Sequence, residues 1–283
     1  MKTPEFGEVA EKMRRATVQI VSGSGRSHGV GSGVIWNADG AVITNAHVAR
    51  DKSLQVELWN GRSFPARVAE RDDRADLALL HLPAGDLPSL EWRPSHSLRP
   101  GELVIAVGNP LGFTGALTTG VVHTSGPVRG LGRNHWVQAS IRLAPGNSGG
   151  PLADAEGRVV GINTMIVMGG LALAIPSDRV VDFLKWGRGP ALGVTLRPVE
   201  YTGGGIGLLV LDIEPNSAAE YVSLAAGDVL VGANGRSFES ADDLSEAIDQ
   251  SAGSILRLRF LRGGRANQRE VSVAFPGPRR EAA

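Results

Sequence analysis

The sequence of 283 residues has no cysteine, only 5% aromatic residues and a formal net charge of +0. The absence of cysteine excludes disulfide bonds and thiolate metal sites, so the packing of the core alone must hold the fold. The balanced charge gives no electrostatic reason to expect nucleic acid or an anionic membrane as a partner.

Long apolar segments are missing as well. No run of about 18 or more apolar residues could cross a bilayer, so we expect no membrane anchor in this chain. Residues 1–15 lack the apolar stretch of a secretory signal. The location therefore stays open: periplasmic or otherwise extracytoplasmic if a signal has been removed, and cytoplasmic if not.

Glycine and proline are abundant, with 38 and 16 residues. Together with the few aromatic residues, they indicate a chain rich in strands and turns, and its length is sufficient for two domains.

One glycine-rich segment, Ala144–Leu152, contains a single hydroxyl group, that of Ser148. Glycine permits a positive φ and a close approach of substrate, so the amides of Gly146 and Ser148 could both point at one developing negative oxygen. A tight turn between two strands would explain the same residues, because Gly, Asn and Ser are common turn formers. A nucleophilic role for Ser148 therefore requires a base elsewhere in the chain.

Among six histidines, His47 is the best candidate for that base. It follows the Asp39-Gly40 turn signal and a short β-branched run, and a histidine at the end of a strand can reach into a cleft. We interpret the other five as solvated, structural or edge residues: His28, His81, His96, His123 and His135.

A carboxylate must orient the base, and Asp76 is the best candidate because it immediately precedes the apolar run Leu77–Leu82. A buried, paired Asp at such a boundary is costly and therefore suggestive, although a surface Asp that begins a strand is the simpler alternative. Asp72 and Asp73 lie in the polar segment 70–74, which we interpret as a solvated turn. The order His47, Asp76, Ser148 is that of the chymotrypsin-type triad.

Five motifs in this order resemble the HtrA (DegP-like) family of trypsin-fold serine proteases. They are Thr44-Asn-Ala-His-Val48, Asp76-Leu-Ala-Leu-Leu80, Ala106-Val-Gly-Asn-Pro-Leu-Gly112, Thr118-Thr-Gly-Val-Val122 and Gly146-Asn-Ser-Gly-Gly-Pro151. The resemblance implies His47 as general base, Asp76 as its orienting group, Ser148 as nucleophile, and the amides of Gly146 and Ser148 as the oxyanion hole. It implies no cofactor and no metal.

Two positions depart from related patterns. The family usually has Asp eight residues before the nucleophile, where this chain has Ser140, and digestive trypsin-like enzymes have Asp where this chain has Asn147. Activation by cleavage of a pro-segment is therefore not expected, and the support for the Ser148 turn must come from neighbouring loops or a bound peptide.

The spacing of strands and turns predicts a mainly β fold with a double β-barrel and then a small α/β unit. The resemblance implies that the barrels are chymotrypsin-like and that the α/β unit is a PDZ domain. We expect an N-terminal segment 1–15, a protease domain 16–186 closed by a helix that Ser177 caps, a linker 187–190, a PDZ domain 191–276 and a tail 277–283. Strands are predicted within 17–21, 33–36, 54–59, 77–82, 102–107, 120–123 and 158–164.

Resemblance to the HtrA arrangement implies two binding sites. Leu192, Gly193 and Val194 would receive the C-terminal carboxylate of a peptide through backbone amides and strand addition. Leu244 and Ile248 would face either this groove or the core. Leu143 and Ile166 would line the S1 pocket of the protease domain, which predicts cleavage after small or medium aliphatic residues.

Two functions remain open at this stage. The first is a serine endopeptidase that hydrolyses unfolded or misfolded proteins through an acyl-enzyme, with C-terminal peptides bound at the PDZ domain. The second is a chaperone or peptide-sensing binding protein whose protease domain is silent or idles. By family habit we expect a homotrimer formed through the segment around Phe6, and regulation by the glycine-rich loops 108–116 and 167–173.

Overall fold

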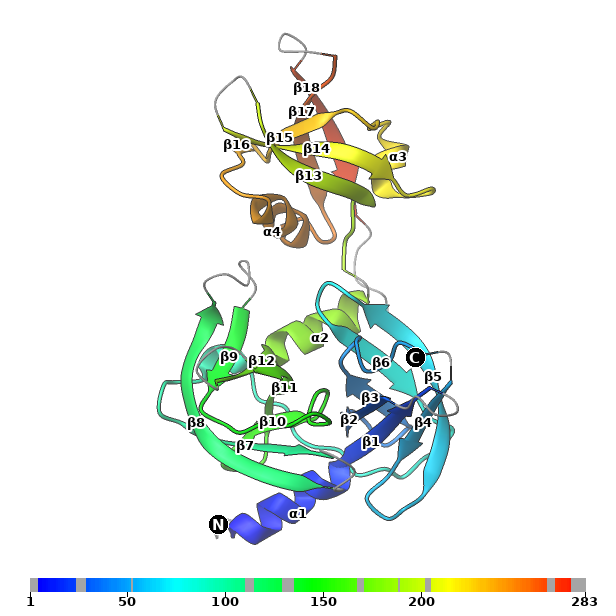
Figure 1. The fold of residues 1–283 in the computed structure, drawn as a ribbon, viewed down its shortest axis with the longest axis vertical. Coiled ribbons are helices and arrows are strands. Elements are labelled where there is room, and N and C mark those ends of the chain that lie inside the picture. Colours follow the sequence, from blue (N-terminus) through cyan, green and yellow to red (C-terminus); the bar gives the residue numbers. More distant parts are fainter. Residues whose placement is uncertain are drawn as a thin grey trace. The chain divides into compact units, whose positions relative to one another are not determined.

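The computed structural model describes residues 5–23, 29–51, 53–109, 115–128, 135–166, 171–187, 189–201, 205–263 and 268–275. The chain forms two compact units, Met1–Gly187 and Arg188–Ala283 (Figure 1). Most of loop 108–116 and of loop 167–173, namely 110–114 and 167–170, lies outside the described residues, as does His28.

The first unit begins with helix α1 (Phe6–Ala16). Val9, Met13 and Ala16 are buried, and their spacing places them on one helix face. The first barrel follows, and its strands close in the order β1-β2-β3-β6-β5-β4. These are β1 (Thr17–Ser22), β2 (Gly29–Ile35), β3 (Ala41–Thr44), β4 (Leu54–Glu57), β5 (Ser63–Asp72) and β6 (Leu77–His81).

The second barrel closes in the order β10-β11-β12-β9-β8-β7. Its strands are β7 (Leu103–Gly108), β8 (Ala116–Pro127), β9 (His135–Ala139), β10 (Pro151–Asp154), β11 (Val159–Ile166) and β12 (Ala172–Pro176). The short helix η1 (Ser95–Ser97) precedes this barrel and helix α2 (Ser177–Trp186) follows it. The double β-barrel expected from the sequence is therefore confirmed.

A core cluster joins the two barrels. It includes Val34 and Leu77 from the first barrel, Val107 and Ile162 from the second, and residues of both α1 and α2 such as Met13 and Val180. Each barrel also has its own apolar cluster. Because the joint core fixes one barrel against the other, loops from both can meet at their junction with a defined geometry.

The second unit is a sheet ordered β13-β14-β15-β17-β18, with β16 paired to β15. Its elements are β13 (Val194–Glu200), β14 (Ile206–Ile213), α3 (Ala218–Tyr221), β15 (Val229–Ala233), β16 (Arg236–Ser237), α4 (Asp242–Gln250), β17 (Ile255–Leu261) and β18 (Gln268–Ala274). Asn234 and Gly235 join β15 to β16 with φ of 47° and 82°, the positive values that a type I′ hairpin turn requires.

Two local predictions were wrong. Asp72 is not solvated: β5 extends to it, it is only 5% exposed, and its Oδ1 accepts hydrogen bonds from the amides of Arg74 and Ala75. Ser177 does not cap α2, because its hydroxyl donates instead to the main-chain oxygen of Arg93, at 2.6 Å. In the described ranges, no helix has the length and apolar character needed to cross a bilayer.

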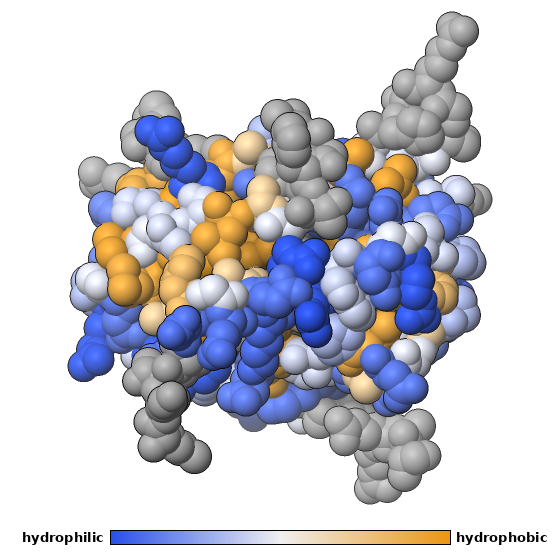
Figure 2. Space-filling model, turned by 90° about the horizontal axis from the view of Figure 1, so that it is seen from below, coloured by the Kyte–Doolittle hydropathy of each residue, from blue (hydrophilic) through white to orange (hydrophobic). Residues whose placement is uncertain are grey.

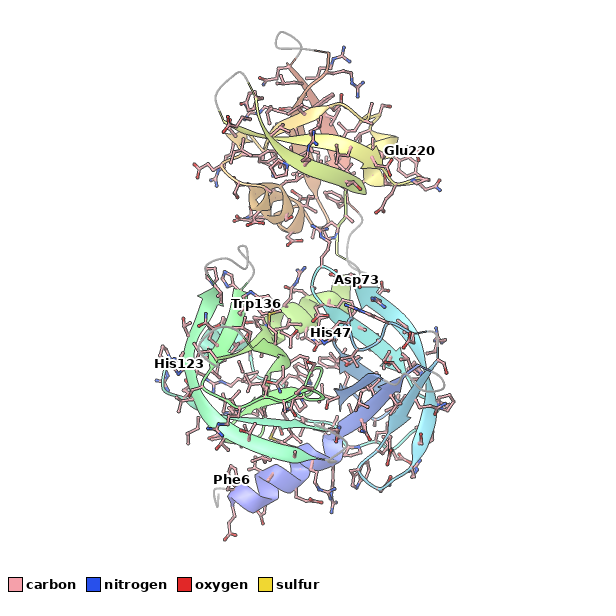
Figure 3. All side chains as sticks on the ribbon, in the orientation of Figure 1. Phe6, His47, Asp73, His123, Trp136 and Glu220 are labelled. Carbon is pink, nitrogen blue, oxygen red and sulfur yellow. The ribbon has the colours of Figure 1, made fainter. Side chains whose placement is uncertain are left out.

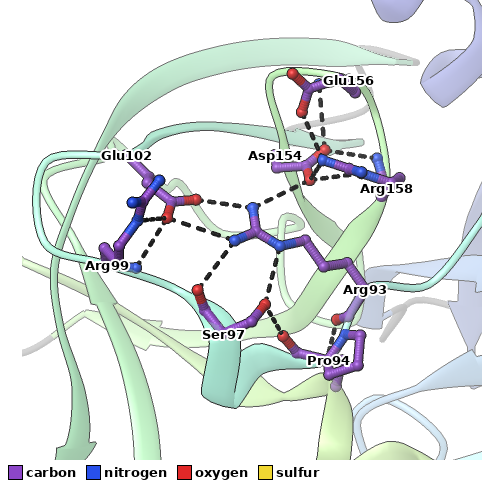
Figure 4. Close-up of polar contacts among 9 residues, drawn as sticks. Arg93, Pro94, Ser97, Arg99, Glu102, Asp154, Glu156 and Arg158 are labelled. Atoms are coloured by element: carbon purple, nitrogen blue, oxygen red, sulfur yellow. Dashed lines mark hydrogen bonds and ion pairs between the residues drawn. The ribbon is translucent and has the colours of Figure 1, made fainter.

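Arg93 lies in the segment that connects the two barrels. It is the centre of an ion-pair network that joins this segment to the second barrel (Figure 4). Its guanidinium lies 2.7 Å from Glu102 and 3.3 Å from Asp154, and it also donates to Ser97. Asp154 is almost fully buried and accepts from Arg158 as well. A buried carboxylate requires such partners, so the network fixes the connection that leads into the second barrel.

Candidate active site

His47 and Asp76 meet because the strands that carry them are neighbours. His47 follows β3 in a turn, Asp76 immediately precedes β6, and Thr44 pairs with Ala78 in the antiparallel ladder of these strands. Asp76 has a φ of 53°, a left-handed conformation that Asp tolerates better than most residues. Figure 3 shows His47 between the two barrels.

Three hydrogen bonds join the pair. His47 Nδ1 lies 3.0 Å from Oδ1 and 2.9 Å from Oδ2 of Asp76, and the His47 amide donates to Oδ1 at 3.0 Å. Thr164 Oγ1 donates to Oδ2 at 2.8 Å. Burial opposes ionisation of Asp76, but the hydrogen bonds from the His47 side chain, the His47 amide and Thr164 outweigh it, and the pKa of this carboxyl lies below its ordinary value. An ionised Asp76 fixes the ring and directs Nε2 away from itself.

Ser148 lies on a turn with two left-handed glycines. Gly146 has a φ of 104° and Gly149 a φ of 88°. The amides of Asn147 and Gly150 donate to the oxygens of Ala144 and Asn147, and Gly149 N donates to Asn163 O on β11. In the part of the chain that the structure describes, the amides of Gly146 and Ser148 donate to no other group, which leaves both available to a ligand oxygen.

Thr164, on β11, links the serine to the His–Asp pair. The Ser148 hydroxyl donates to the main-chain oxygen of Thr164 at 2.9 Å, while the Thr164 side chain binds Asp76. Thr164, a residue of the second barrel, thus contacts both Ser148 and Asp76. The Ser148 hydroxyl is thus engaged with the Thr164 main chain and not with the His47 ring, and catalytic hydrogen bonds often form only when substrate binds.

The turn is also braced by residues that sequence reasoning missed. Ser32 on β2 contacts the main chain at Gly146 and Ser148, and Asn45 Nδ2 donates to Asp76 O at 3.1 Å. Ser140, at the end of β9, is exposed and bonds to Val121 on β8. Nothing in the residue types Ser, Asn and Thr marks them as special, so only their contacts identify them.

The predicted S1 and peptide-binding residues occupy varied environments. Leu143 is half-buried against the core of the second barrel, and the main chain of Ile166 pairs with Ala172, while its side chain is outside the described part. In the second unit, Leu192, Leu244 and Ile248 belong to one buried apolar cluster. Val194 begins edge strand β13 and packs against this cluster, and Gly193 immediately precedes the strand.

The remaining described histidines lie apart from this site. Figure 3 shows His123 on the outside of the second barrel, and His96 is 76% exposed beside Asp178. Within the described ranges, no group of three His, Asp or Glu side chains could hold a metal ion.

Comparison with known proteins agrees with both units. Residues 31–162 match the trypsin-like peptidase domain and residues 190–273 match the PDZ domain. The chain is 34% identical to serine protease HTRA1 of Xenopus tropicalis, over 82% of this chain and 57% of that protein. It is 36% identical to the "Probable periplasmic serine endoprotease DegP-like" of Chlamydia trachomatis, over 86% of this chain and 53% of that protein. The chain thus spans little more than half the length of these relatives.

A solved structure covers nearly the whole chain. The HtrA-type protease AlgW with tripeptide has a TM-score of 0.66 and 26% identity, and the match covers 98% of both chains. The two domain matches, their order and these relatives agree with one another. The chain belongs to the HtrA family of trypsin-fold serine proteases and carries one PDZ domain.

Proposed function

We propose that this protein is a serine endopeptidase that hydrolyses peptide bonds of unfolded or misfolded proteins. The observation that carries the proposal is the arrangement of His47 and Asp76, bonded through Nδ1, beside a Ser148 that lies on a turn with two available amides. His47, Asp76 and Ser148 are the proposed triad, and Gly146 and Ser148 supply the proposed oxyanion hole. The relatives named as serine proteases support the same activity.

The chemistry follows from these groups. His47 Nε2 takes the proton of the Ser148 hydroxyl as Oγ attacks the substrate carbonyl carbon, and the negative charge moves to the carbonyl oxygen between the two amides. When the carbon–nitrogen bond breaks, His47 gives its proton to the leaving amine and an acyl-enzyme remains. His47 then takes a proton from water, which attacks the ester carbon, and returns that proton to Ser148 Oγ as the acid is released.

Casein, an unfolded protein, tests this activity directly. We expect the wild type to hydrolyse it and Ser148→Ala to lose at least about 1,000-fold in rate, because removal of a triad member leaves only the hole and substrate binding. Equal hydrolysis by both proteins would refute the proposal. The alternative of a peptide sensor with a silent protease domain is not favoured, since no member of the triad is replaced.

The PDZ domain is proposed to bind peptide C-termini. Strand β13 is at the edge of its sheet, so an added peptide strand would find unpaired main-chain groups there. Gly193, with a φ of 74°, immediately precedes this strand and suits a loop that receives a carboxylate. Leu192, Val194, Leu244 and Ile248 are the proposed apolar floor of that groove. A labelled peptide with a free carboxylate should bind more tightly than its C-terminal amide, and equal affinity would contradict this site.

We also propose an oligomeric state and a location. The apolar surface on the face that carries α1 (Figure 2), and the 54% exposure of Phe6 on this helix, support a homotrimer formed through the N-terminal segment. Light scattering that shows a monomer at micromolar concentration would refute it. The DegP-like relative supports an extracytoplasmic location, which cell fractionation would test.

A further inference from the structure

Ser32 lies in the middle of β2, is fully buried, and belongs to the opposite barrel from Ser148. A buried hydroxyl must find partners, and this one is satisfied on both sides. It donates to the main-chain oxygen of Gly146 at 2.6 Å and accepts from the amide of Asn109 at 2.9 Å. Because Asn109 supplies a proton to Oγ, the proton of Ser32 itself is directed at Gly146.

The main chain of Ser32 makes a second contact with the same turn. Its amide donates to the oxygen of Ser148 at 2.8 Å. One residue therefore restrains the carbonyl groups of Gly146 and Ser148, on either side of Asn147. The Ser148 amide belongs to the planar peptide unit between them, so Ser32 holds the peptide unit on each side of it.

Ser32 is itself held in place. Its carbonyl oxygen accepts from Thr44 Oγ1 on β3, at 2.6 Å. Gly149 approaches this carbonyl so closely that an added Cβ would overlap it, and a Cβ on Gly150 would overlap the oxygen of Val107. The turn thus lies directly on β2 and β7, which neighbour each other across the junction of the barrels (Figure 1).

We propose that Ser32 is a positioning residue that holds the 146–148 turn in the shape in which both of its amides can stabilise an oxyanion. The inference rests on the proposed proteolytic function and deepens it. Ser32 contacts neither the His–Asp pair nor, in this arrangement, the reacting atoms, so it acts only through the turn. It supplies from the first barrel a support for the turn that the Ser140 hydroxyl, bonded to Val121 on β8, does not give.

The test compares Ser32→Ala with Ser177→Ala in the full chain. Ser177 is also buried and donates to a main-chain oxygen at 2.6 Å, but that oxygen belongs to Arg93, away from the turn. With a peptide substrate, we expect Ser32→Ala to lower kcat by about 10- to 100-fold with KM nearly unchanged, since loss of a whole oxyanion donor lowers it by about 100- to 1,000-fold. A peptide boronic acid, which forms a tetrahedral adduct on Ser148, should lose affinity by the same factor. Ser177→Ala should change neither kcat nor the affinity for the boronic acid.

A second measurement does not depend on catalysis. Hydrogen exchange of the amides of Asn147, Gly149 and Gly150 should become about ten-fold faster in Ser32→Ala and stay unchanged in Ser177→Ala. If both variants keep the wild-type kcat, boronate affinity and exchange rates, the proposal is overturned. If the wild type shows no hydrolysis that depends on Ser148, the proposed function fails, and the exchange rates alone decide whether Ser32 holds the turn.

Discussion

Thr164 Oγ1 lies 2.8 Å from Asp76 Oδ2 and donates a hydrogen bond to it. The contact crosses from the second barrel to the first and joins residues 88 positions apart in the chain. The main-chain oxygen of the same threonine accepts a hydrogen bond from the Ser148 hydroxyl. A substitution that takes away the hydroxyl of Thr164 therefore removes the contact with Asp76 and keeps the contact with Ser148. Asp76 keeps its bonds to His47 but loses one donor.

Thr164→Val should lower kcat/KM by about five-fold, which corresponds to the roughly 1 kcal/mol of a typical hydrogen bond. The lost donor is one of those that lower the pKa of Asp76, so this pKa should rise and the carboxylate should become protonated at a higher pH than in the wild type. The titration profile of the Asp76 carboxyl, followed by carbon NMR, should therefore move to higher pH. Thr164→Ser keeps the donor and is the control; identical profiles for the valine and serine variants would contradict this role.

Glu102 tests the network around Arg93. Hydrogen bonds from Arg93 and Arg99 lower the pKa of Glu102 from 4.5 to about 2. Above pH 4.5 the carboxylate is ionised in both folded and unfolded chains, and its stabilisation is complete; between 4.5 and about 2 only the unfolded chain takes up the proton, so this stabilisation is lost. Glu102→Gln should thus lower the free energy of unfolding by about 1–2 kcal/mol at pH 7, with a difference from wild type that shrinks below pH 4.5.

Urea denaturation of the two proteins at pH 7 and pH 3 measures this effect. Glu156→Gln is the control, because the Glu156 side chain is 54% exposed and its pair with Arg158 is at the surface. Such pairs contribute about 0–1 kcal/mol. If Glu102→Gln lowers the free energy of unfolding as much at pH 3 as at pH 7, the charge of the Glu102 carboxylate is not the cause of the lost stability.

Gly149 combines a φ of 88° with contact against Ser32 and Thr44, and an added Cβ would overlap both. Gly149→Ala should therefore destabilise the protein by at least about 2 kcal/mol. Gly61→Ala is the matched control: its φ is 78°, but no atom lies within 4 Å of the added Cβ. Conformational strain alone should cost this control about 1 kcal/mol. Equal losses of thermal stability in the two variants would mean that the close packing of Gly149 against β2 is unimportant.

Much of the fold and the proposed triad could be predicted, because local patterns carry them. Turn signals and apolar runs mark the strands, and His47 and Asp76 each lie at the end of one. The supporting contacts could not be predicted in this way. Ser32 is 114 positions from Gly146, and Ser177 is 84 positions from Arg93, so each partner is set by how the strands and barrels pack. Small polar residues favour turns and caps locally, and that preference gave the wrong role for Ser177.

Asp72 shows the same limit in a polar segment. Charged neighbours suggest exposure, yet the carboxylate is buried because it accepts two amides of its own turn. The support expected for the Ser148 turn from neighbouring loops is supplied in the structure by a strand of the first barrel. Sequence reasoning had no access to that contact, since it depends on the register of β2 against the turn.

Leu143 tests the proposed S1 pocket. It is half-buried beside the core of the second barrel, and no acidic residue lies at the adjacent positions Arg142 and Ala144. An apolar pocket discriminates between side chains by only about 1–3 kcal/mol per methylene, so the wild type should cleave many sites after small or medium aliphatic residues. Leu143→Asp places a carboxylate there and should shift cleavage toward Lys and Arg, as mass spectrometry of casein fragments would reveal. Leu143→Asn is the control, because asparagine has nearly the size of aspartate but no charge. It separates the effect of the carboxylate from that of the lost apolar surface. If the aspartate and asparagine variants cleave the same sites as the wild type, Leu143 does not line the pocket.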